Sequence, residues 1–280
     1  MEDMKFERVL VAVDGSVESR SAVDSLFALK LPLIQALVVS VSEVTSRPSA
    51  EMVTAVADRF REAGISCDIS TPETQSRHVG EAIVDEAQRF NPDLLVMGSR
   101  GYGDFESLVR GSESHRVLSG VTCPVLLGRA AATRPSTGRL LLAIGGQESD
   151  ARTIADAMGV ARAAGKKLIV LHVVRTLSDV ITSPYLDPIQ AEVELLDPVV
   201  EALRDSGLAA DGVVTPGGAA EEITKLARAH DVDLIVIGHG PRSDLGGLLS
   251  GDVRAAVIHL SDRPVLVSPG RLGQVAQEVA

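Results

Sequence analysis

Short apolar runs alternate along the chain with longer stretches in which apolar residues recur at helical spacing. Arg8–Val13 reads RVLVAV, and Ser19–Leu31 then places Ala22, Val23 and Leu26 along one helical face. In the first half of the chain, this pattern predicts strands at Arg8–Val13, Leu37–Val41, Ser66–Ser70, Leu94–Met97 and Val125–Leu127, and helices at Ser19–Leu31, Ala50–Ala63, Val79–Phe90 and Ser112–Leu118.

The same series of runs then occurs a second time. Val9–Gly15 matches Leu140–Gly146 at an offset of 131 residues, and Asp93–Gly98 matches Asp233–Gly238 at an offset of 140. Several such matches in one order indicate an internal duplication. Because the offset grows by nine, the second copy carries nine extra residues, which we place within Arg175–Pro198.

Short strands that alternate with helices predict an α/β fold with parallel sheets. We expect two tandem Rossmann-like domains, each a five-stranded parallel sheet with helices on both faces, related by a pseudo-two-fold axis. The small and polar stretch Ala130–Arg139 suits a linker, so the expected domains span 1–132 and 137–280. In such folds, ligands bind beyond the carboxyl ends of the strands.

Composition narrows the classes of function. Of the 280 residues, 45% are hydrophobic and 2% are aromatic, and the net charge is −11. An acidic chain with few aromatic residues is poorly suited to bind nucleic acid or an anionic membrane surface. No apolar run approaches the roughly 20 residues that span a bilayer, and the N-terminus carries no apolar signal core. We therefore expect a cytoplasmic protein whose two cysteines stay reduced.

The candidate chemistry follows the fourth strand of the first copy. Gly98 and Gly101 are three residues apart, and Gly111-Ser112 stands at the start of a predicted helix. Glycines let the backbone approach a ligand, and a helix N-terminus favours phosphate. Asp14 ends the first strand, where a carboxylate can accept ribose hydroxyls or meet a metal-bound phosphate. From spacing alone, the glycines can equally well shape a loop and Ser112 cap a helix.

The chain resembles the universal stress protein family in its tandem form. The resemblance rests on VAVDGS at Val11–Ser16, VMGSRG at Val96–Gly101, GSESHRVL at Gly111–Leu118, CPVLL at Cys123–Leu127 and LHVV at Leu171–Val174. The ATP-binding pattern of that family is Gly, two residues, Gly, nine residues, Gly, then Ser or Thr. The first copy meets this pattern at Gly98, Gly101, Gly111 and Ser112.

The resemblance implies a role for each matching residue. Adenine would meet the backbone of Val41 and Ser42 and would lie against Ala12 and Val13, with Asp14 and Gly98 near the ribose and base. Gly101, Gly111, Ser112 and the backbone of Glu113 would hold the phosphates. Met97 and Arg100 complete the expected set. Mg²⁺ would accompany ATP, held mostly by phosphate oxygens and water, and no residue is expected to serve as a dedicated metal ligand.

The second copy departs from the pattern at three positions. Gly145 stands where the first copy has Asp14, Pro241 replaces Gly101, and Asp252 replaces Ser112. Proline has no N–H to offer, and a carboxylate repels phosphate. The sequence therefore predicts that only the first copy binds ATP.

Three classes of function stay open. The first is an ATP-binding stress or signalling protein whose partners or oligomeric state change with the ligand. The second is an interaction scaffold without nucleotide. The third is a slow ATPase or nucleotidyl transferase, although no catalytic residue is identifiable. In this family the last strands of two domains pair, so the two copies can pair within one chain. We also expect a homodimer that forms through the edges of the fifth strands, Pro124–Leu127 and Pro264–Val267. An unknown protein partner is a further expectation.

Overall fold

The computed structural model describes residues 5–43, 49–74, 78–98, 113–129, 135–145, 150–174, 188–238 and 253–269. Contacts within the chain divide it into two compact units, with the division between Arg134 and Pro135. We call Lys5–Arg134 the first unit and the part from Pro135 onward the second unit. The expected domain limits, 1–132 and 137–280, stay a prediction.

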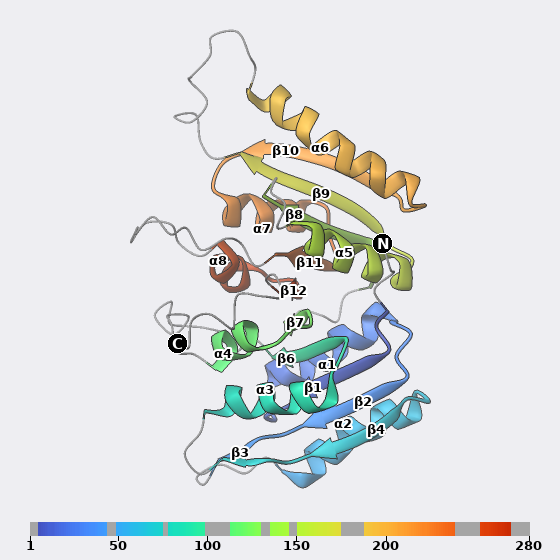
Figure 1. Ribbon diagram of the computed structural model, residues 1–280, viewed down its shortest axis with the longest axis vertical. Helices are drawn as coiled ribbons and strands as arrows, with labels where there is room; N and C mark the ends of the chain where they lie inside the picture. The colour runs from blue at the N-terminus through green and yellow to red at the C-terminus, as the bar shows by residue number, and fades with distance from the viewer. Residues whose placement is uncertain are drawn as a thin grey trace. The chain divides into compact units, whose positions relative to one another are not determined.

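The first unit is built on a parallel sheet with the strand order β4-β2-β1-β6-β7 (Figure 1). Its strands are β1 (Arg8–Ala12), β2 (Gln35–Val39), β4 (Ser66–Ser70), β6 (Leu94–Gly98) and β7 (Val125–Gly128). In the register, Leu10 of β1 lies between Leu37 of β2 and Leu95 of β6. The central strands are continuous apolar runs because both of their faces are covered.

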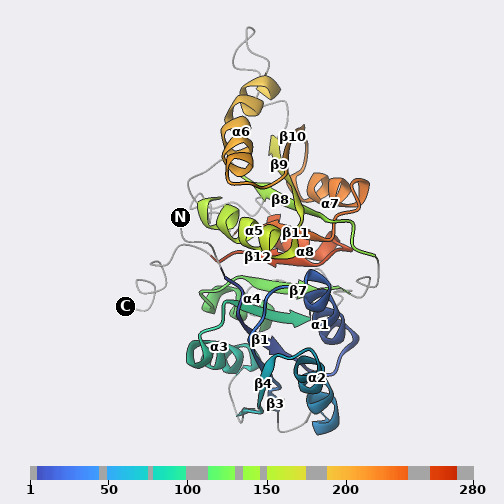
Figure 2. The ribbon, with the colours of Figure 1, turned by 90° about the vertical axis from the view of Figure 1, so that its right-hand side faces the viewer.

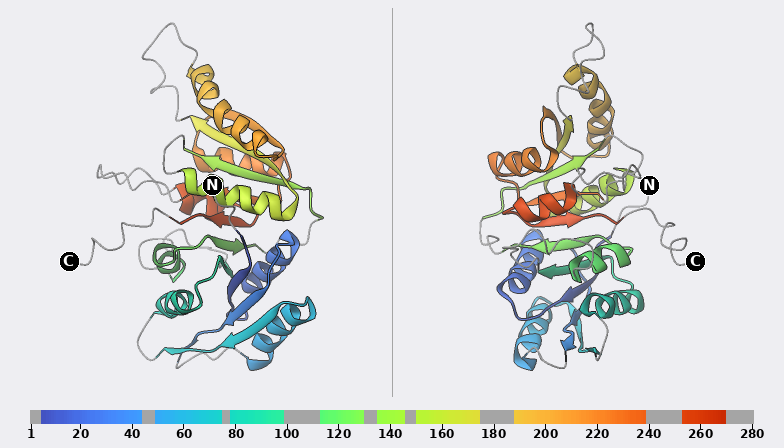
Figure 3. Two further views of the ribbon diagram at one scale, coloured as in Figure 1. Left: turned by 45° about the vertical axis from the view of Figure 1, so that its right-hand side comes forward. Right: turned by 90° about the vertical axis from the view of Figure 1, so that its left-hand side faces the viewer.

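Helices among the described residues cover both faces of this sheet. The views in Figures 2 and 3 show α1 (Val17–Leu29) and α2 (Ala50–Glu62) on one face. They show α3 (Val79–Phe90) and α4 (Glu113–Gly120) on the opposite face. Helices on both sides of a parallel sheet form the three-layer arrangement that the alternating pattern predicted.

The second unit repeats this arrangement with the strand order β10-β9-β8-β11-β12. Its strands are β8 (Arg139–Ile144), β9 (Lys167–Val174), β10 (Ala210–Pro216), β11 (Leu234–Ile237) and β12 (Val265–Val267). Its helices are α5 (Asp150–Ala164) and α6 (Pro188–Asp205) on one face and α7 (Ala219–Ala229) and α8 (Val253–Leu260) on the other (Figure 2). The predicted α/β class with parallel sheets is confirmed.

One pair of short strands was not expected from the sequence, and the extra length of the second copy lies partly in a longer helix. After β2, the chain forms a further short strand, β3 (Ser42–Glu43), which pairs in parallel with β5 (Glu73–Thr74). In the second unit, part of the extra length lies in α6, which has 18 residues where α2 has 13. Pro188 begins this helix, as suits a residue without an N–H, but Pro198 lies inside it.

An aspartate ties the amino ends of β1 and β6 together in the first unit. The Oδ2 atom of Asp93 accepts the backbone N–H of Glu7 and of Arg8, at 3.0 and 2.8 Å. The backbone N–H of Asp93 in turn donates to the carbonyl of Arg8 at 2.8 Å. Each of these hydrogen bonds fixes β1 against β6. Together they set the register of the two strands, and this register determines where the opposite, carboxyl ends of the strands lie.

Asp233 holds the equivalent position in the second unit and has more partners. Its carboxylate accepts the backbone N–H groups of Thr137 and Gly138, the Ser136 hydroxyl and the ammonium of Lys166, which is 2.5 Å away. Lys166 is buried. Burial raises the pKa of Asp233, but the bonds from Lys166, Thr137 and Ser136 outweigh it and hold the pKa below the ordinary value of 3.8.

A second aspartate, Asp156 on α5, is fully buried. Its Oδ1 atom lies 3.0 Å from Nε of Arg152, and its other oxygen has no hydrogen-bond partner among the described residues. Burial raises the pKa of the Asp156 carboxyl, against the opposing effects of Arg152 and Ser268. In the first unit, Ala22 and Gly128 make the corresponding helix-to-strand contact, with no polar side chain between them.

We expect Asp233→Asn to destabilise the second unit, because it leaves the buried Lys166 without its counter-charge. Removal of one member of a buried pair costs about 3 kcal/mol in the free energy of unfolding. A carboxylate with a lowered pKa stabilises the fold above pH 3.8 and loses this effect as pH falls through the lowered pKa. Urea unfolding should therefore show a difference that is large at pH 7 and shrinks toward pH 3. An equal difference at both pH values would contradict the assignment.

We expect Asp156→Asn to have the opposite effect. An acid whose pKa is raised in the fold binds its proton more tightly there, so ionisation lowers stability as pH rises through the raised pKa. The amide stays neutral, so the variant should melt about 3 °C higher at pH 8, the shift that ~1 kcal/mol produces in a domain of this size. Near pH 4 the gain should vanish. Asp205→Asn, at the exposed end of α6, is the control, and a gain independent of pH would refute the prediction.

Candidate functional site

The order of the strands identifies the edge of the first unit at which a ligand would bind. The chain passes from β1 to β2 on one side and returns to β6 on the other side of β1. In doubly wound α/β folds, ligands bind beyond the carboxyl ends of the strands at such a reversal, which here lies between β1 and β6. Asp14 follows β1 by two residues, and Gly98 is the last residue of β6. Both predicted residues therefore lie at the switch point.

Asp14 is exposed, and the beginning of α1 orients its carboxylate. Its Oδ1 atom accepts the backbone N–H of Ser16 at 2.9 Å and the Ser16 hydroxyl at 2.6 Å. The same Ser16 caps α1, because its Oγ atom accepts the backbone N–H of Ser19 at 3.1 Å. The carboxylate at the site is thus held by a chain of hydrogen bonds that begins in the helix.

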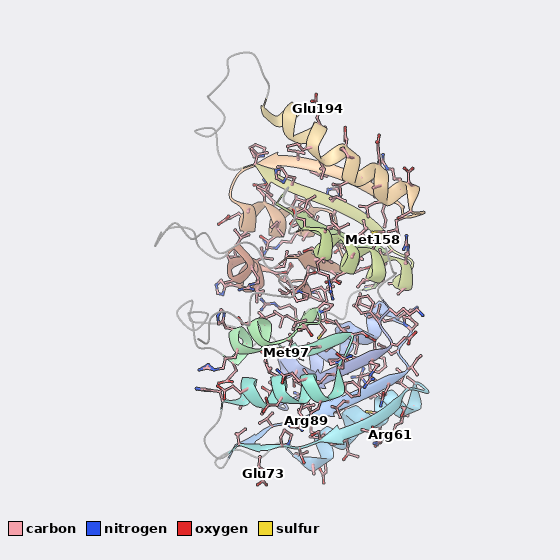
Figure 4. The ribbon with its side chains drawn as sticks, in the orientation of Figure 1. Arg61, Glu73, Arg89, Met97, Met158 and Glu194 are labelled. Carbon is pink, nitrogen blue, oxygen red and sulfur yellow. The ribbon has the colours of Figure 1, made fainter. Side chains whose placement is uncertain are left out.

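The end of the sheet beneath Asp14 is apolar. Ala12, Val13 and Met97 are each at most 8% exposed, and Met97 lies inside the unit (Figure 4). The backbone of Val13 is fully engaged: its N–H donates to the carbonyl of Val39, and its carbonyl accepts the hydroxyl of the buried Ser40, both at 2.9 Å. These residues form a closed apolar floor rather than a source of free polar groups.

Val41 and Ser42, the two residues expected to meet adenine, follow β2 after one intervening residue, Ser40. Val41 is half-buried, and Ser42 begins the short strand β3 opposite Glu73 of β5. A strand at this point gives the backbone a fixed direction beyond the main sheet. The ligand role of these two residues stays a prediction, and the short β3–β5 pair was not foreseen from the sequence.

Gly98 has a structural role that is independent of any ligand. A Cβ atom at this position would lie 2.6 Å from the backbone nitrogen of Ser19 and 2.7 Å from the carbonyl carbon of Glu18. The first turn of α1 therefore packs directly against the end of β6, and only glycine permits this approach. In the second unit, a Cβ atom at Gly238 would instead meet a side chain, at 2.5 Å from the hydroxyl oxygen of Thr153.

Glu113 is the first residue of α4, directly after Gly111-Ser112 in the sequence. Its carboxylate is turned toward the start of α3, where it accepts the backbone N–H of Gly80 and lies 3.2 Å from Nδ1 of His78. Four other predicted site residues lie outside the described residues, namely Arg100, Gly101, Gly111 and Ser112.

Three residues next to the site were missed by sequence reasoning. His78 and Gly80 contact Glu113, and Met52 of α2 reaches the turn after β1, where a Cβ on Gly15 would lie 3.4 Å from the Met52 methyl group. A glycine in the first turn of a helix was the one available signal, since glycine disfavours helices and is retained where another chain segment approaches closely.

The corresponding edge of the second unit carries a negative charge that the sequence comparison did not indicate. Gly145 has no carboxylate of its own, but the side chain of Asp150 folds back from α5 and accepts the backbone N–H of Gly145 at 2.9 Å. A negative charge is therefore present near the end of β8, supplied from the helix. Nδ1 of His172 lies 3.1 Å from the carbonyl of Ile144, the position that Ser40 serves in the first unit. Pro241 and Asp252 lie outside the described residues.

Comparison with known proteins agrees with this arrangement. The sequence profile of the universal stress protein family matches the chain twice, at residues 5–129 and 137–269. A universal stress protein of Mycolicibacterium smegmatis is 25% identical over 289 aligned residues, which cover 92% of this chain and 96% of that protein. Universal stress protein YxiE of Bacillus subtilis is 29% identical over 143 residues, 46% of this chain and 97% of YxiE.

Among solved structures, a universal stress protein from Archaeoglobus fulgidus matches 97% of this chain and 99% of its own length, with a TM-score of 0.72 and 20% identity. This likeness concerns the fold. Together with the two profile matches, which cover most of the sequence, it accounts for the duplicated strand order of both units. The chain therefore belongs to the universal stress protein family and carries two of its domains in tandem.

Proposed function

We propose that the first unit binds ATP at the carboxyl edge of β1 and β6 and that the chain acts as a nucleotide-dependent stress-response protein. The observation that carries this proposal is the position of the glycine motif. Its first residue, Gly98, ends β6, and its last residue, Ser112, directly precedes helix α4. The motif thus connects a strand end at the switch point to a helix N-terminus, where backbone N–H groups and the helix dipole favour phosphate.

Asp14 supports the same proposal. Its carboxylate is exposed at the end of β1, and its Oδ1 atom is oriented by two bonds from Ser16. Such a preoriented acceptor suits the two hydroxyls of a ribose. The apolar floor of Ala12, Val13 and Met97 would lie below the base, and the backbone of Val41 and Ser42 would supply its polar contacts.

Mg²⁺ would accompany the nucleotide and would neutralise part of the phosphate charge. Among the described residues, no three His, Cys, Asp or Glu side chains gather as metal ligands. Asp14, the acidic side chain at the end of β1, would lie near a cation that is held mainly by phosphate oxygens and water.

The described helices include none that is long and apolar enough to cross a membrane. A cytoplasmic location remains part of the proposal.

The proposed mode of action is a shift between two states of the chain. ATP would favour the state that binds it more tightly, and the change would be read by a partner protein or by a second copy of the chain. Association of two chains through the edges of β7 (Val125–Gly128) or β12 (Val265–Val267) belongs to this proposal. Light scattering on the purified protein, with and without ATP, measures the oligomeric state.

The first expected result is a stoichiometry of about one ATP per chain. Calorimetric titration of the full chain in Mg²⁺ buffer measures it, with cAMP and dAMP as competitors, since other universal stress proteins have been solved in complex with these two nucleotides. Gly111→Val should abolish binding, because a branched side chain would stand where the phosphates approach the backbone. Two equivalent sites per chain, or unchanged binding by the variant, would refute the assignment. Absence of any binding would favour a scaffold, and turnover of ATP in the same sample would favour an ATPase.

The second expected result concerns Asp14→Asn. The amide oxygen can still accept both bonds from Ser16, so thermal stability should stay within 1 °C or so of the unsubstituted chain. The other amide atom is a donor and cannot accept a ribose hydroxyl, so affinity for ATP should fall by roughly tenfold, the size of one lost hydrogen bond to a charged group. Asp58→Asn, on the exposed face of α2, is the matched control. Equal affinity of both variants for ATP would exclude Asp14 from the site.

A further inference from the structure

The side chain of Glu113 ties the beginning of α4 to the beginning of α3, beside a long ion pair of 3.9 Å between Nε of Arg116 and Oε1 of Glu81. Glu113, the first residue of α4, directs its carboxylate at the first turn of α3, where the N–H of Gly80 donates to its Oε2 atom. Nδ1 of His78, the residue that precedes α3, lies 3.2 Å from its Oε1 atom. The first N–H groups of a helix lack partners within the helix and favour negative charge. Glu113 therefore caps a helix other than its own.

This contact also explains why α3 has a glycine in its first turn. A Cβ atom at position 80 would lie 2.7 Å from the backbone carbonyl oxygen of Glu113 and 2.9 Å from its Oε2 atom. It would also approach Cβ of Arg116 to 3.0 Å, one turn further along α4. The two helix starts are thus in van der Waals contact through backbone atoms, and any side chain at position 80 would push α4 away.

The second unit lacks every part of this contact. At the constant offset of 140 residues, His78 corresponds to Gly218, Gly80 to Ala220 and Glu113 to Val253. The helices themselves are retained, since α7 and α8 begin at positions equivalent to the starts of α3 and α4. The fold of the unit can therefore form without the carboxylate and without the glycine. Both occur in the unit that keeps the glycine motif.

We propose that Glu113 is a positioning residue for nucleotide binding: by capping α3, it fixes the N-terminus of α4, the helix that directly follows the glycine motif in the sequence. This inference rests on the proposed function of the first unit. Preorganised backbone donors bind an anion more tightly than donors that must be ordered on binding, because they lose less conformational entropy when the anion binds. Gly80 and His78 are the groups through which Glu113 acts.

The sign of the effect distinguishes positioning from simple electrostatics. A carboxylate one residue from Ser112 repels phosphate, so its removal should tighten ATP binding if charge alone mattered. If Glu113 positions α4, its removal should weaken binding even though a repulsive charge is lost. Glutamine separates the two effects further, because its amide oxygen still accepts the N–H of Gly80 while the charge is gone.

The test is calorimetric titration of the full chain with ATP in Mg²⁺ buffer. We expect Glu113→Val to weaken binding about tenfold, as for the loss of one charge-assisted hydrogen bond, and Glu113→Gln to recover most of that loss. Glu62→Val, an exposed glutamate at the far end of α2, is the control and should change nothing. Tighter binding by both Glu113 variants would overturn the proposal and leave Glu113 as a repulsive charge only.

A second pair of variants tests the close contact between the two helix starts. Gly80→Ala should lower the melting temperature and weaken ATP binding, because its methyl group collides with the Glu113 backbone. The double variant Gly80→Ala/Glu113→Val keeps this collision, which involves the backbone of residue 113, so it should melt as low as Gly80→Ala and bind ATP no better. Recovery of the melting temperature and the affinity would overturn the positioning role. If the unsubstituted chain binds ATP and the double variant binds equally well, this inference fails alone; if the unsubstituted chain binds none, the proposed function fails and the inference with it.

Discussion

The close approach of α1 to the end of β6 is the constraint on which the candidate site depends. With a Cβ of residue 98 only 2.6 Å from the Ser19 backbone, strand and helix can meet in this way only through a glycine. The approach places Ser16 at the N-cap of α1, and the same hydroxyl holds Asp14. The orientation of the exposed carboxylate therefore follows from a packing contact between a helix and a strand, before any ligand contributes to it.

The second unit keeps the glycine but not the backbone contact. A Cβ atom at Gly238 would lie 2.5 Å from the hydroxyl oxygen of Thr153 and 3.6 Å from its Cβ, so a side chain of α5, and not its backbone, approaches the end of the strand. One turn further along, however, the second unit buries Asp156 beside Ser268, where the first unit has only alanine against glycine. A buried carboxyl with a raised pKa is a cost that the first unit avoids. The duplicated fold thus tolerates polar groups in the second unit at a position that the first unit packs tightly.

Much of the fold was predictable because buried parallel strands are continuous apolar runs. The duplication also provided a second copy of each run, in the same order, to support its assignment as a strand. Val79–Phe90 was predicted with the bounds that α3 has. The two-residue strands β3 and β5 were not, since two residues carry no periodicity. The fold-back of Asp150 onto Gly145 was also hidden, because a side-chain bond across a turn leaves no pattern in the sequence. Of the candidate site, the sequence indicated Glu113 as a residue beside the phosphates but not its bond to Gly80.

The two units together separate the residues that the fold requires from those that a ligand would require. Glycine at the end of the fourth strand occurs in both units and is explained by packing, so by itself it carries little information about nucleotides. Gly80 is different, because the equivalent helix of the second unit begins equally well with Ala220. A glycine that weakens a helix and is dispensable for the fold requires another reason. In the first unit that reason is the close contact with Glu113, at the beginning of the helix that follows the glycine motif.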